Sequence, residues 1–329
     1  MSQNREPLSE FAIISRFFSD LAGESGAIDV GVGDDCALLK IPPGQRLAMS
    51  IDTVVEGRHF PASAAVEDIA YRAVAVAASD LAAMGATPLA ATLALALPGA
   101  DESWLQQFSR GLRAALGAFD LSLIGGDTTR GPLTITVQVH GLLPDDRALL
   151  RSGAKPGDRV FVSGNLGDAA AALAMFAGEL DVDPSQREYL YRRFYRPSPR
   201  LDLGCALLPV AASAIDISDG LLADLGHILE CSGVGARVYV DRLPLSGALQ
   251  SHSDRRSVVQ WALTGGDDYE LCFTVAEDCV SRLEAIAAQC DVSLTEIGEI
   301  VAGAGLQCLD ADGEPVALET AGYQHFSEE

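Results

Sequence analysis

Apolar residues along the first half of the chain recur with two different spacings, which predict alternating helices and strands. Helical spacing occurs over residues 8–21, 65–84 and 101–119. Gly85 is expected to end the second helix, and Asp101 or Ser103 to cap the third. Short apolar runs predict strands at residues 46–55, 89–97, 121–124 and 133–143. The glycine-rich sequence GGDTTRGP between the last two strands is interpreted as a loop.

A second alternating pattern follows a polar connector at residues 144–157, and we place a domain boundary there. The predicted domains are residues 1–147 and 148–329. In the second domain, strands are expected at residues 159–163, 214–217, 271–275, 295–301 and 306–309, and helices at residues 168–178, 185–195 and 221–232. Because both halves mix strands with helices, the fold class is α/β or α+β. The pattern leaves the order of the strands open.

Composition narrows the classes of protein that fit this pattern. Apolar residues make up 48% of the 329 residues, enough for a sizeable core. The net charge of −23 predicts repulsion of nucleic acid and of anionic membranes, so neither is expected as a partner. Lys40 and Lys155 are the only lysines, and no GxxxxGK[ST] sequence is present. A nucleotide phosphate would therefore have to be met by metal ions, arginines and backbone N–H groups rather than by a lysine loop.

Cysteines and the apolar stretches favour a cytoplasmic location. The seven cysteines are scattered without a CxxC pair, which is typical of reduced thiols and not of a disulfide framework or a zinc site. The N-terminus lacks the apolar core of a signal peptide. The most apolar stretch, residues 81–100, is interrupted by Gly85, Pro88 and Pro98, so it is interpreted as protein core and not as a membrane span.

Aspartates recur beside glycines at the ends of apolar segments. They are Asp34, Asp35, Asp52, Asp80, Asp127, Asp216, Asp219, Asp267 and Asp268. Singly, most of them are explained as turn or cap residues. Asp80 is the exception, because it lies in an Ala- and Leu-rich helix where a carboxylate is unusual. Two converging carboxylates would repel by about 4 kcal/mol at a separation of about 4 Å, and a divalent cation such as Mg²⁺, Mn²⁺ or Ca²⁺ would remove that repulsion.

Other kinds of site are less well supported by the sequence. DADGEP at Asp310 lacks the acidic twelfth residue of an EF-hand loop, and no GxSxG or protein-kinase motif is present. The strand-to-helix sequence SGNLGDAAAAL, from Ser163, could present N–H groups to a phosphate or form an ordinary turn. The five histidines are dispersed. His59 follows the Asp52 strand closely, and both a substrate contact and a structural role remain open for it.

Together these motifs resemble the thiamine-monophosphate kinase family, whose members use ATP to convert thiamine monophosphate to thiamine diphosphate. The resemblance covers nearly the whole chain and rests on GVGDDCALL, IDTVVEGRHF, SDLAAMGA, LIGGDTTRGP, RSGAKPGD, RPSPR, AIDISDGLLADL, TGGDDYELCF and GYQHF. It implies the two-domain fold of aminoimidazole ribonucleotide synthetase. In that fold an N-terminal metal- and ATP-binding domain pairs its sheet across a homodimer with that of a second copy, and an α/β domain follows. It also implies several Mg²⁺ ions and ATP as ligands, with K⁺ as a further candidate ion.

The resemblance also implies a role for individual residues. The metal positions that it implies are Asp35, Ser50, Ile51, Asp52, Asp80, Asp127, Asp216 and Asp219. Positions that meet ATP are Gly126, Asp127, Arg151 and Ser218, and substrate positions are His59, Asp267 and Tyr323. Catalytic roles fall to Asp127, Arg151 and Asp219. Asp34 and Asp268 are weaker members of the set.

Three positions depart from the family pattern. Ile51 stands where a metal-site threonine is frequent, although its backbone carbonyl could still serve. Asp267 replaces a glutamate and so has a shorter reach, and Tyr323 stands where a tryptophan often stacks. The last two departures affect the details of thiamine recognition and leave the expected reaction unchanged.

A phosphate monoester is already anionic near neutral pH, so the expected reaction needs no strong general base. We therefore expect direct in-line transfer of the γ-phosphoryl group, with Mg²⁺ held by aspartates and Arg151 adding positive charge.

Enzymes that share this fold are the nearest alternatives. Selenophosphate synthetase would need a reactive cysteine or selenocysteine and a lysine near the N-terminus, but the first cysteine is Cys36 and no lysine precedes it. The hydrogenase-maturation carbamoyl dehydratase ends in a cysteine-containing tail, whereas this chain ends in HFSEE. Aminoimidazole ribonucleotide synthetase lacks supporting motifs. A non-catalytic protein that binds divalent metal for stability is the alternative from another class.

Overall fold

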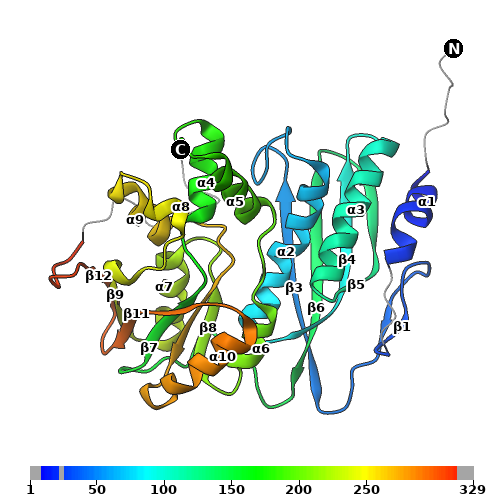
Figure 1. Cartoon of the computed structure of the whole chain (residues 1–329). Helices are drawn as coiled ribbons and strands as arrows, with labels where there is room; N and C mark the ends of the chain where they lie inside the picture. The colour runs from blue at the N-terminus through cyan, green and yellow to red at the C-terminus, as the bar shows by residue number, and fades with distance from the viewer. Residues whose placement is uncertain (1–8, 22–25, 317–329) are drawn as a thin grey trace. The chain divides into compact units, whose positions relative to one another are not determined.

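A computed structural model describes residues 9–21 and 26–316 of the chain (Figure 1). The chain divides into two compact units, each built around its own sheet. The first contains Met1–Leu81 and Thr87–Asp146, and the second contains Ala82–Ala86 and Arg147–Glu329. Within the described ranges, no helix is both long and apolar enough to cross a membrane.

The first unit consists of a small hairpin, a four-stranded sheet and helices. Its elements are α1 (Glu10–Ile13), a π-helical turn (Ile14–Phe18), a 3₁₀ turn (Ser19–Leu21), β1 (Ile28–Val30), β2 (Leu38–Leu39), β3 (Gln45–Val55), α2 (Val66–Met84), β4 (Thr87–Leu97), α3 (Glu102–Ala118), β5 (Ser122–Arg130) and β6 (Thr134–Pro144). The order in the main sheet is β3-β6-β4-β5, and only β4 and β5 are parallel. Helices α2 and α3 cover one face of this sheet (Figure 1).

Burial alternates along the strands of the first sheet, so its two faces differ. On β4 and β6 the odd-numbered residues, such as Leu93 and Val137, are buried. On β3 the even-numbered side chains share the face of these buried residues, because Asp52 pairs with Val137. The odd-numbered residues of β3 lie on the opposite face, where Met49 and Ile51 are each 60% exposed.

The interpretation of GGDTTRGP as a loop is wrong. Strand β5 extends through Arg130, and its residues from Gly125 onward pair in parallel with β4. At Gly126 φ is +155°, and a Cβ would lie 1.9 Å from the Leu93 carbonyl oxygen. Gly126 therefore allows close contact between strands here rather than a turn.

The second unit consists of a six-stranded sheet covered by helices. Its elements are β7 (Arg159–Ser163), α4 (Asp168–Ala177), α5 (Pro184–Tyr195), α6 (Leu201–Leu207), β8 (Ala211–Asp216), α7 (Leu221–Ser232), β9 (Gly235–Tyr239), a 3₁₀ turn (Val240–Arg242), α8 (Gly247–Gln250), α9 (Arg255–Thr264), β10 (Leu271–Val275), a second 3₁₀ turn (Glu277–Arg282), α10 (Leu283–Cys290), β11 (Leu294–Val301) and β12 (Gly305–Leu309). The strand order is β12-β9-β11-β7-β10-β8, and β12 and β9 form the parallel pair.

Hydrophobic side chains pack on both faces of this second sheet. Val160 and Val162 of β7 belong to a core that contains residues of α7 and α9. Phe161, between them in sequence, belongs to another core with residues of α6 and α10. Alternate residues of one strand thus enter different cores, as expected for a sheet with helices on both sides. The predicted elements of this half are present, whereas β9, α6, α8, α9 and α10 were not predicted from the sequence.

Candidate functional site

Two carboxylates and a hydroxyl lie together between β3 and α2 in the first unit. The Ser50 hydroxyl donates a hydrogen bond to Oδ2 of Asp80. Ser50, Asp52 and Asp80 are all half-buried. Burial, and then the negative charge of Asp80, raise the pKa of Asp52 to about 6. Two carboxylates that disfavour each other's ionisation, beside a hydroxyl oxygen, form a donor set of the kind that Mg²⁺ prefers.

A cavity of about 480 Å³ lies in the same unit and combines an apolar side with an acidic side. Phe11, Phe18 and Ile124 contribute apolar surface to it. Asp35 and Asp127, both exposed, contribute carboxylates. Gly126 also lines the cavity. Because Gly126 and Asp127 pair with β4, this part of β5 forms one wall of the cavity.

Two predicted site residues near Asp52 in sequence, Ile51 and His59, have different surroundings. Ile51 is exposed on the opposite face of β3 from Ser50 and Asp52, so only its backbone could join them at a metal site. His59 is half-buried, and its Nδ1 accepts a hydrogen bond from the backbone N–H of Val55 at 3.0 Å.

In the second unit, the turn between β8 and α7 is organised by a buried aspartate. Oδ2 of Asp224, a residue 2% exposed, accepts hydrogen bonds from the backbone N–H groups of three consecutive residues. These donors are Ser218 at 2.9 Å, Asp219 at 3.0 Å and Gly220 at 3.1 Å. Burial, the largest effect, raises the pKa of Asp224 to about 7, although these hydrogen bonds oppose the rise. The N-cap residue of α7 is Gly220, so Asp219 does not occupy the cap position of this helix.

A second loop, residues 265–270, runs beside this turn. The N–H of Asp267 donates to the Ser218 carbonyl at 2.8 Å, and the N–H of Tyr269 donates to the Ile217 carbonyl at 2.9 Å. A Cβ on Gly266 would lie 2.4 Å from the Ser218 carbonyl oxygen. The two loops are therefore held backbone against backbone, and Asp216, Ser218, Asp219 and Asp267 belong to one local structure.

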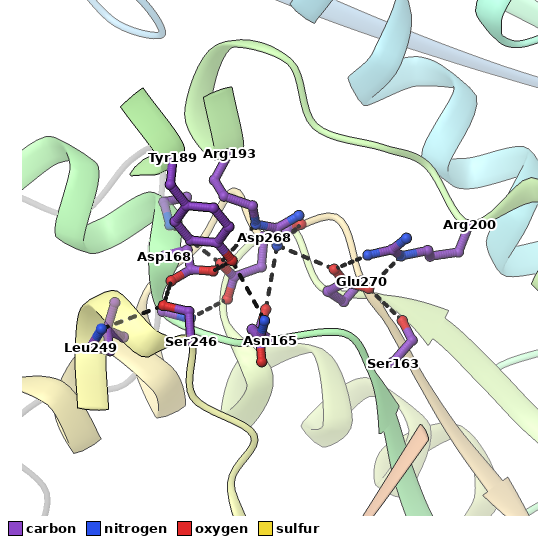
Figure 2. Close-up of polar contacts among 12 residues, drawn as sticks. Ser163, Asn165, Asp168, Tyr189, Arg193, Arg200, Ser246, Leu249, Asp268 and Glu270 are labelled. Atoms are coloured by element: carbon purple, nitrogen blue, oxygen red, sulfur yellow. Dashed lines mark hydrogen bonds and ion pairs between the residues drawn. The ribbon is translucent and has the colours of Figure 1, made fainter. Parts of the chain in front are cut away.

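Hydrogen bonds and ion pairs of Asp268 and Glu270 connect the second loop to the rest of the unit (Figure 2). The Arg200 guanidinium donates to both oxygens of Glu270 at 2.6 Å, and the Ser163 hydroxyl also donates to Glu270 at 2.6 Å. Asp268 is 1% exposed and accepts the N–H groups of Gly167 at 2.7 Å and Ala169 at 3.4 Å.

The loop SGNLGD makes a poor phosphate cradle. Of its backbone N–H groups, that of Gly164 donates to Ser293 and that of Leu166 donates to Pro244. Asp268 accepts a third, from Gly167. These three N–H groups already have acceptors within the fold, so they are not available to bind a phosphate.

Comparisons with known proteins identify the family. The N-terminal and C-terminal domain models of AIR synthase related protein match residues 33–143 and 155–310. A thiamine-monophosphate kinase from Escherichia coli K12 is 50% identical over 319 residues, which span 97% of this chain and 98% of the relative. The chain belongs to the thiamine-monophosphate kinase family. A crystal structure of this kinase from Stenotrophomonas maltophilia K279a, 45% identical, matches with a TM-score of 0.86 over 94% of this chain and 98% of that one.

A further solved member of the thiamine-monophosphate kinase family is AaThiL complexed with AMPPCP and TMP. It is 32% identical and matches with a TM-score of 0.76 over 97% of both chains. The mixed α/β two-domain fold of this chain is thus the fold of the family.

Residues that the family resemblance implies are divided between the two units. Asp35, Ser50, Ile51, Asp52, Asp80, Gly126 and Asp127 belong to the first unit, with His59. Arg151, Asp216, Ser218, Asp219 and Asp267 belong to the second. Tyr323 lies outside the described residues. In the described part of the chain, no three His, Cys, Asp or Glu side chains are grouped so as to hold a metal ion. The Ser50–Asp52–Asp80 group is the local arrangement that fits Mg²⁺, and the other metal assignments stay predictions.

Arg151 is exposed at the start of the second unit. The Ser232 hydroxyl fixes its backbone, because it donates to the Arg151 carbonyl and accepts the N–H groups of Gly153 and Ala154, each at 3.2 Å. Sequence reasoning missed Asp224, Tyr269, Glu270 and the half-buried arginines Arg193 and Arg200. The sequence does place Asp224 in the quoted motif AIDISDGLLADL, which was the available signal.

Proposed function

We propose that this chain is an ATP-dependent kinase that phosphorylates thiamine monophosphate to thiamine diphosphate. Its close relatives carry that name, and a solved family member is complexed with AMPPCP and TMP. The observation that carries the proposal is the half-buried Asp52–Asp80 pair with the Ser50 hydroxyl. Such a pair is unfavourable without a cation, and a kinase that joins two phosphates needs one.

Magnesium ions would be held by Ser50, Asp52 and Asp80, with Asp35, Asp127, Asp216 and Asp219 as further ligands. Bound Mg²⁺ supplies positive charge, which lets two phosphate groups approach each other. The carbonyl of Ile51 stays a predicted ligand, and K⁺ stays a predicted additional ion. The donor set consists of oxygens alone, which suits Mg²⁺ better than a softer metal.

The remaining site residues of the chain have positioning and charge roles in this proposal. Gly126 and Ser218 would meet the ATP phosphates with Asp127, and Arg151 would add positive charge as the phosphoryl group moves. His59 and Asp267 would contact thiamine monophosphate, together with Tyr323. The acceptor oxygen is already anionic, so transfer proceeds in line and directly, without a side chain acting as a strong base.

The first unit is also proposed to form the homodimer. One face of its sheet is covered by helices, whereas Met49 and Ile51 on the other face are 60% exposed. An exposed apolar sheet face of this kind is typical of a surface that pairs with another sheet. Residues 1–147 would thus bind metal and ATP and dimerise, and residues 148–329 would form the C-terminal α/β domain. The seven scattered thiols favour a cytoplasmic location.

A coupled assay for ADP release tests this function. The protein is mixed with ATP, Mg²⁺ and either thiamine monophosphate or unphosphorylated thiamine. We expect turnover with the monophosphate alone, formation of thiamine diphosphate in equal amount, and loss of turnover when EDTA removes the metal.

Two results would contradict parts of the proposal. Melting that depends on Mg²⁺ without any turnover would identify a metal-binding protein without catalysis. A phosphorylated enzyme trapped by rapid quench would replace direct transfer with a two-step reaction.

A further inference from the structure

The loop that carries Asp267 has an unusual backbone. Asp267 has φ of +70° and Tyr269 has φ of +51°; aspartate is among the residues that tolerate this left-handed region, whereas a bulky side chain such as that of Tyr269 disfavours it. Each costs about 1–3 kcal/mol and persists only where surrounding contacts impose it. Backbone strain of this kind is common at functional sites, so its supporting contacts are informative.

Asp268 and Glu270, which flank Tyr269 in this loop, make the contacts that impose its backbone conformation. Asp268 and Glu270 are buried at 1% and 0% exposure, and they bind the α4 N-terminus and Arg200 respectively. Arg193, from α5, donates to the Asp268 carbonyl at 3.2 Å and lies 3.2 Å from Glu270 (Figure 2). With both neighbours fixed, the backbone at Asp267 and Tyr269 has little freedom to relax.

Within this rigid loop, the Tyr269 hydroxyl donates a hydrogen bond of 2.9 Å to Oδ1 of Asp267. The Tyr269 side chain is 9% exposed, whereas Asp267 is half-buried. The ring is thus held by packing, and its hydroxyl fixes one carboxylate oxygen of the more accessible residue.

We propose that Tyr269 is a positioning residue that orients the Asp267 carboxylate for the thiamine part of the substrate. This inference rests on the proposed function, in which Asp267 contacts thiamine monophosphate. Thiamine carries a cationic thiazolium ring and an aminopyrimidine with N–H donors, and a carboxylate can bind either group. A carboxylate held in one orientation before binding loses less conformational entropy when the substrate arrives.

The short side chain of Asp267 makes this orientation matter more. An aspartate has fewer rotatable bonds and less reach than glutamate, so its carboxylate must already point correctly. Two non-glycine residues in the left-handed region bring the hydroxyl and the carboxylate together across a single intervening residue. A loop built only for stability would be expected to place glycine at these positions.

The test is a set of conservative variants of the full chain, assayed with MgATP and thiamine monophosphate. Tyr269→Phe removes one oxygen and keeps the buried ring, so the fold should persist. We expect the KM for thiamine monophosphate to rise about fivefold, as for loss of one hydrogen bond, while the KM for ATP stays the same. Tyr239→Phe is the matched control, because the Tyr239 hydroxyl donates to Glu299 at 3.2 Å, between β9 and β11 and outside the Asp267 loop and the residues that hold it. It should leave both KM values unchanged.

A double-mutant cycle with Asp267→Gly shows whether Tyr269 acts through Asp267. Asp267→Gly removes the carboxylate and tolerates the positive φ. In that background, Tyr269→Phe should have no further effect on the KM for thiamine monophosphate. An unchanged KM in the single variant would overturn the inference, and so would an equal rise in the Asp267→Gly background. Absence of turnover in the unmodified protein would instead contradict the proposed function itself.

Discussion

The Ser50 hydroxyl on β3 donates a hydrogen bond to the Asp80 carboxylate on α2. Burial, and then the negative charge of Asp80, raise the pKa of the neighbouring Asp52 to about 6. A divalent cation would convert this unfavourable pair into a binding site, and the first prediction follows from that change.

Asp80→Asn should stabilise the metal-free protein and abolish its response to Mg²⁺. Removal of one of two like charges should raise the free energy of unfolding by about 1 kcal/mol. The rise in Tm with added Mg²⁺ should disappear with the ligand, and so should turnover. Thermal melting with Mg²⁺ or EDTA measures both effects. Asp101→Asn is the control, because Asp101 caps α3 through the Trp104 N–H at 2.7 Å and asparagine caps equally well.

Asp127→Asn should separate activity from stability. Asp127 is exposed at the edge of the cavity, so the substitution should leave Tm within about 2 °C of the original value. Loss of a charged ligand should lower kcat by at least about 100-fold. Wild-type-like turnover in this variant would remove Asp127 from the metal site.

Gly126→Ala should disrupt the parallel pairing of β4 and β5. Its Cβ would meet the Leu93 carbonyl oxygen at 1.9 Å, and its φ of +155° disfavours a side chain. We expect a loss of about 2 kcal/mol or more in the free energy of unfolding. The neighbouring Gly125→Ala is the matched control, since a Cβ there meets no atom within 4 Å. Urea denaturation of both variants measures their free energies of unfolding. Equal values would show that β4 and β5 can move apart at Gly126 without loss of stability.

The structure shows where sequence patterns are sufficient and where they fail. Long apolar segments such as 65–84 and 133–143 were predicted correctly, because burial on one face imposes a regular spacing. Strand β5 was partly misread, because glycine is a turn signal in sequence but here allows two backbones to approach. Asp80 was identified as an unusual helical carboxylate from its neighbours alone. Asp224 and Tyr269 were missed, because their partners are defined by how loops fold and not by spacing.

Asp224→Ala should loosen the turn at residues 218–220. Three backbone N–H groups would lose their acceptor, and we expect a loss of about 2–3 kcal/mol in the free energy of unfolding. Amide hydrogen exchange should accelerate at these three residues, and kcat should fall because Ser218 and Asp219 lose their position. Glu230→Ala, on the same helix with a side chain 83% exposed, should change neither measurement. Unchanged exchange at 218–220 would show that Asp224 does not organise the turn.

Asp268→Asn should flatten the dependence of stability on pH. Burial is the largest effect on the pKa of Asp268 and raises it to about 8, from an ordinary value of 3.8. Between these two values the folded state retains a proton that the unfolded state has released. This group therefore favours folding at low pH, and that contribution is lost as the pH rises towards about 8.

Urea denaturation between pH 5 and about pH 8 measures the slope for the native protein and for Asp268→Asn. The difference in slope should approach about 1.4 kcal/mol per pH unit. Asp278→Asn, an exposed change in the same unit, should leave the slope as it is. Identical slopes for all three proteins would show that Asp268 is ionised in both states.

The five residues Ala82–Ala86 belong to the second unit although the chain on both sides of them belongs to the first. Ala82 and Ala83 are part of the core that contains Phe161 and Phe273, and a Cβ on Gly204 would lie 2.0 Å from the Ala82 carbonyl oxygen. A fragment that starts at Arg147 would thus lack a piece of its own interior. During synthesis, this core is completed by a peptide that is made before the rest of the second unit, so transfer of residues 147–329 alone to another protein would leave the core incomplete.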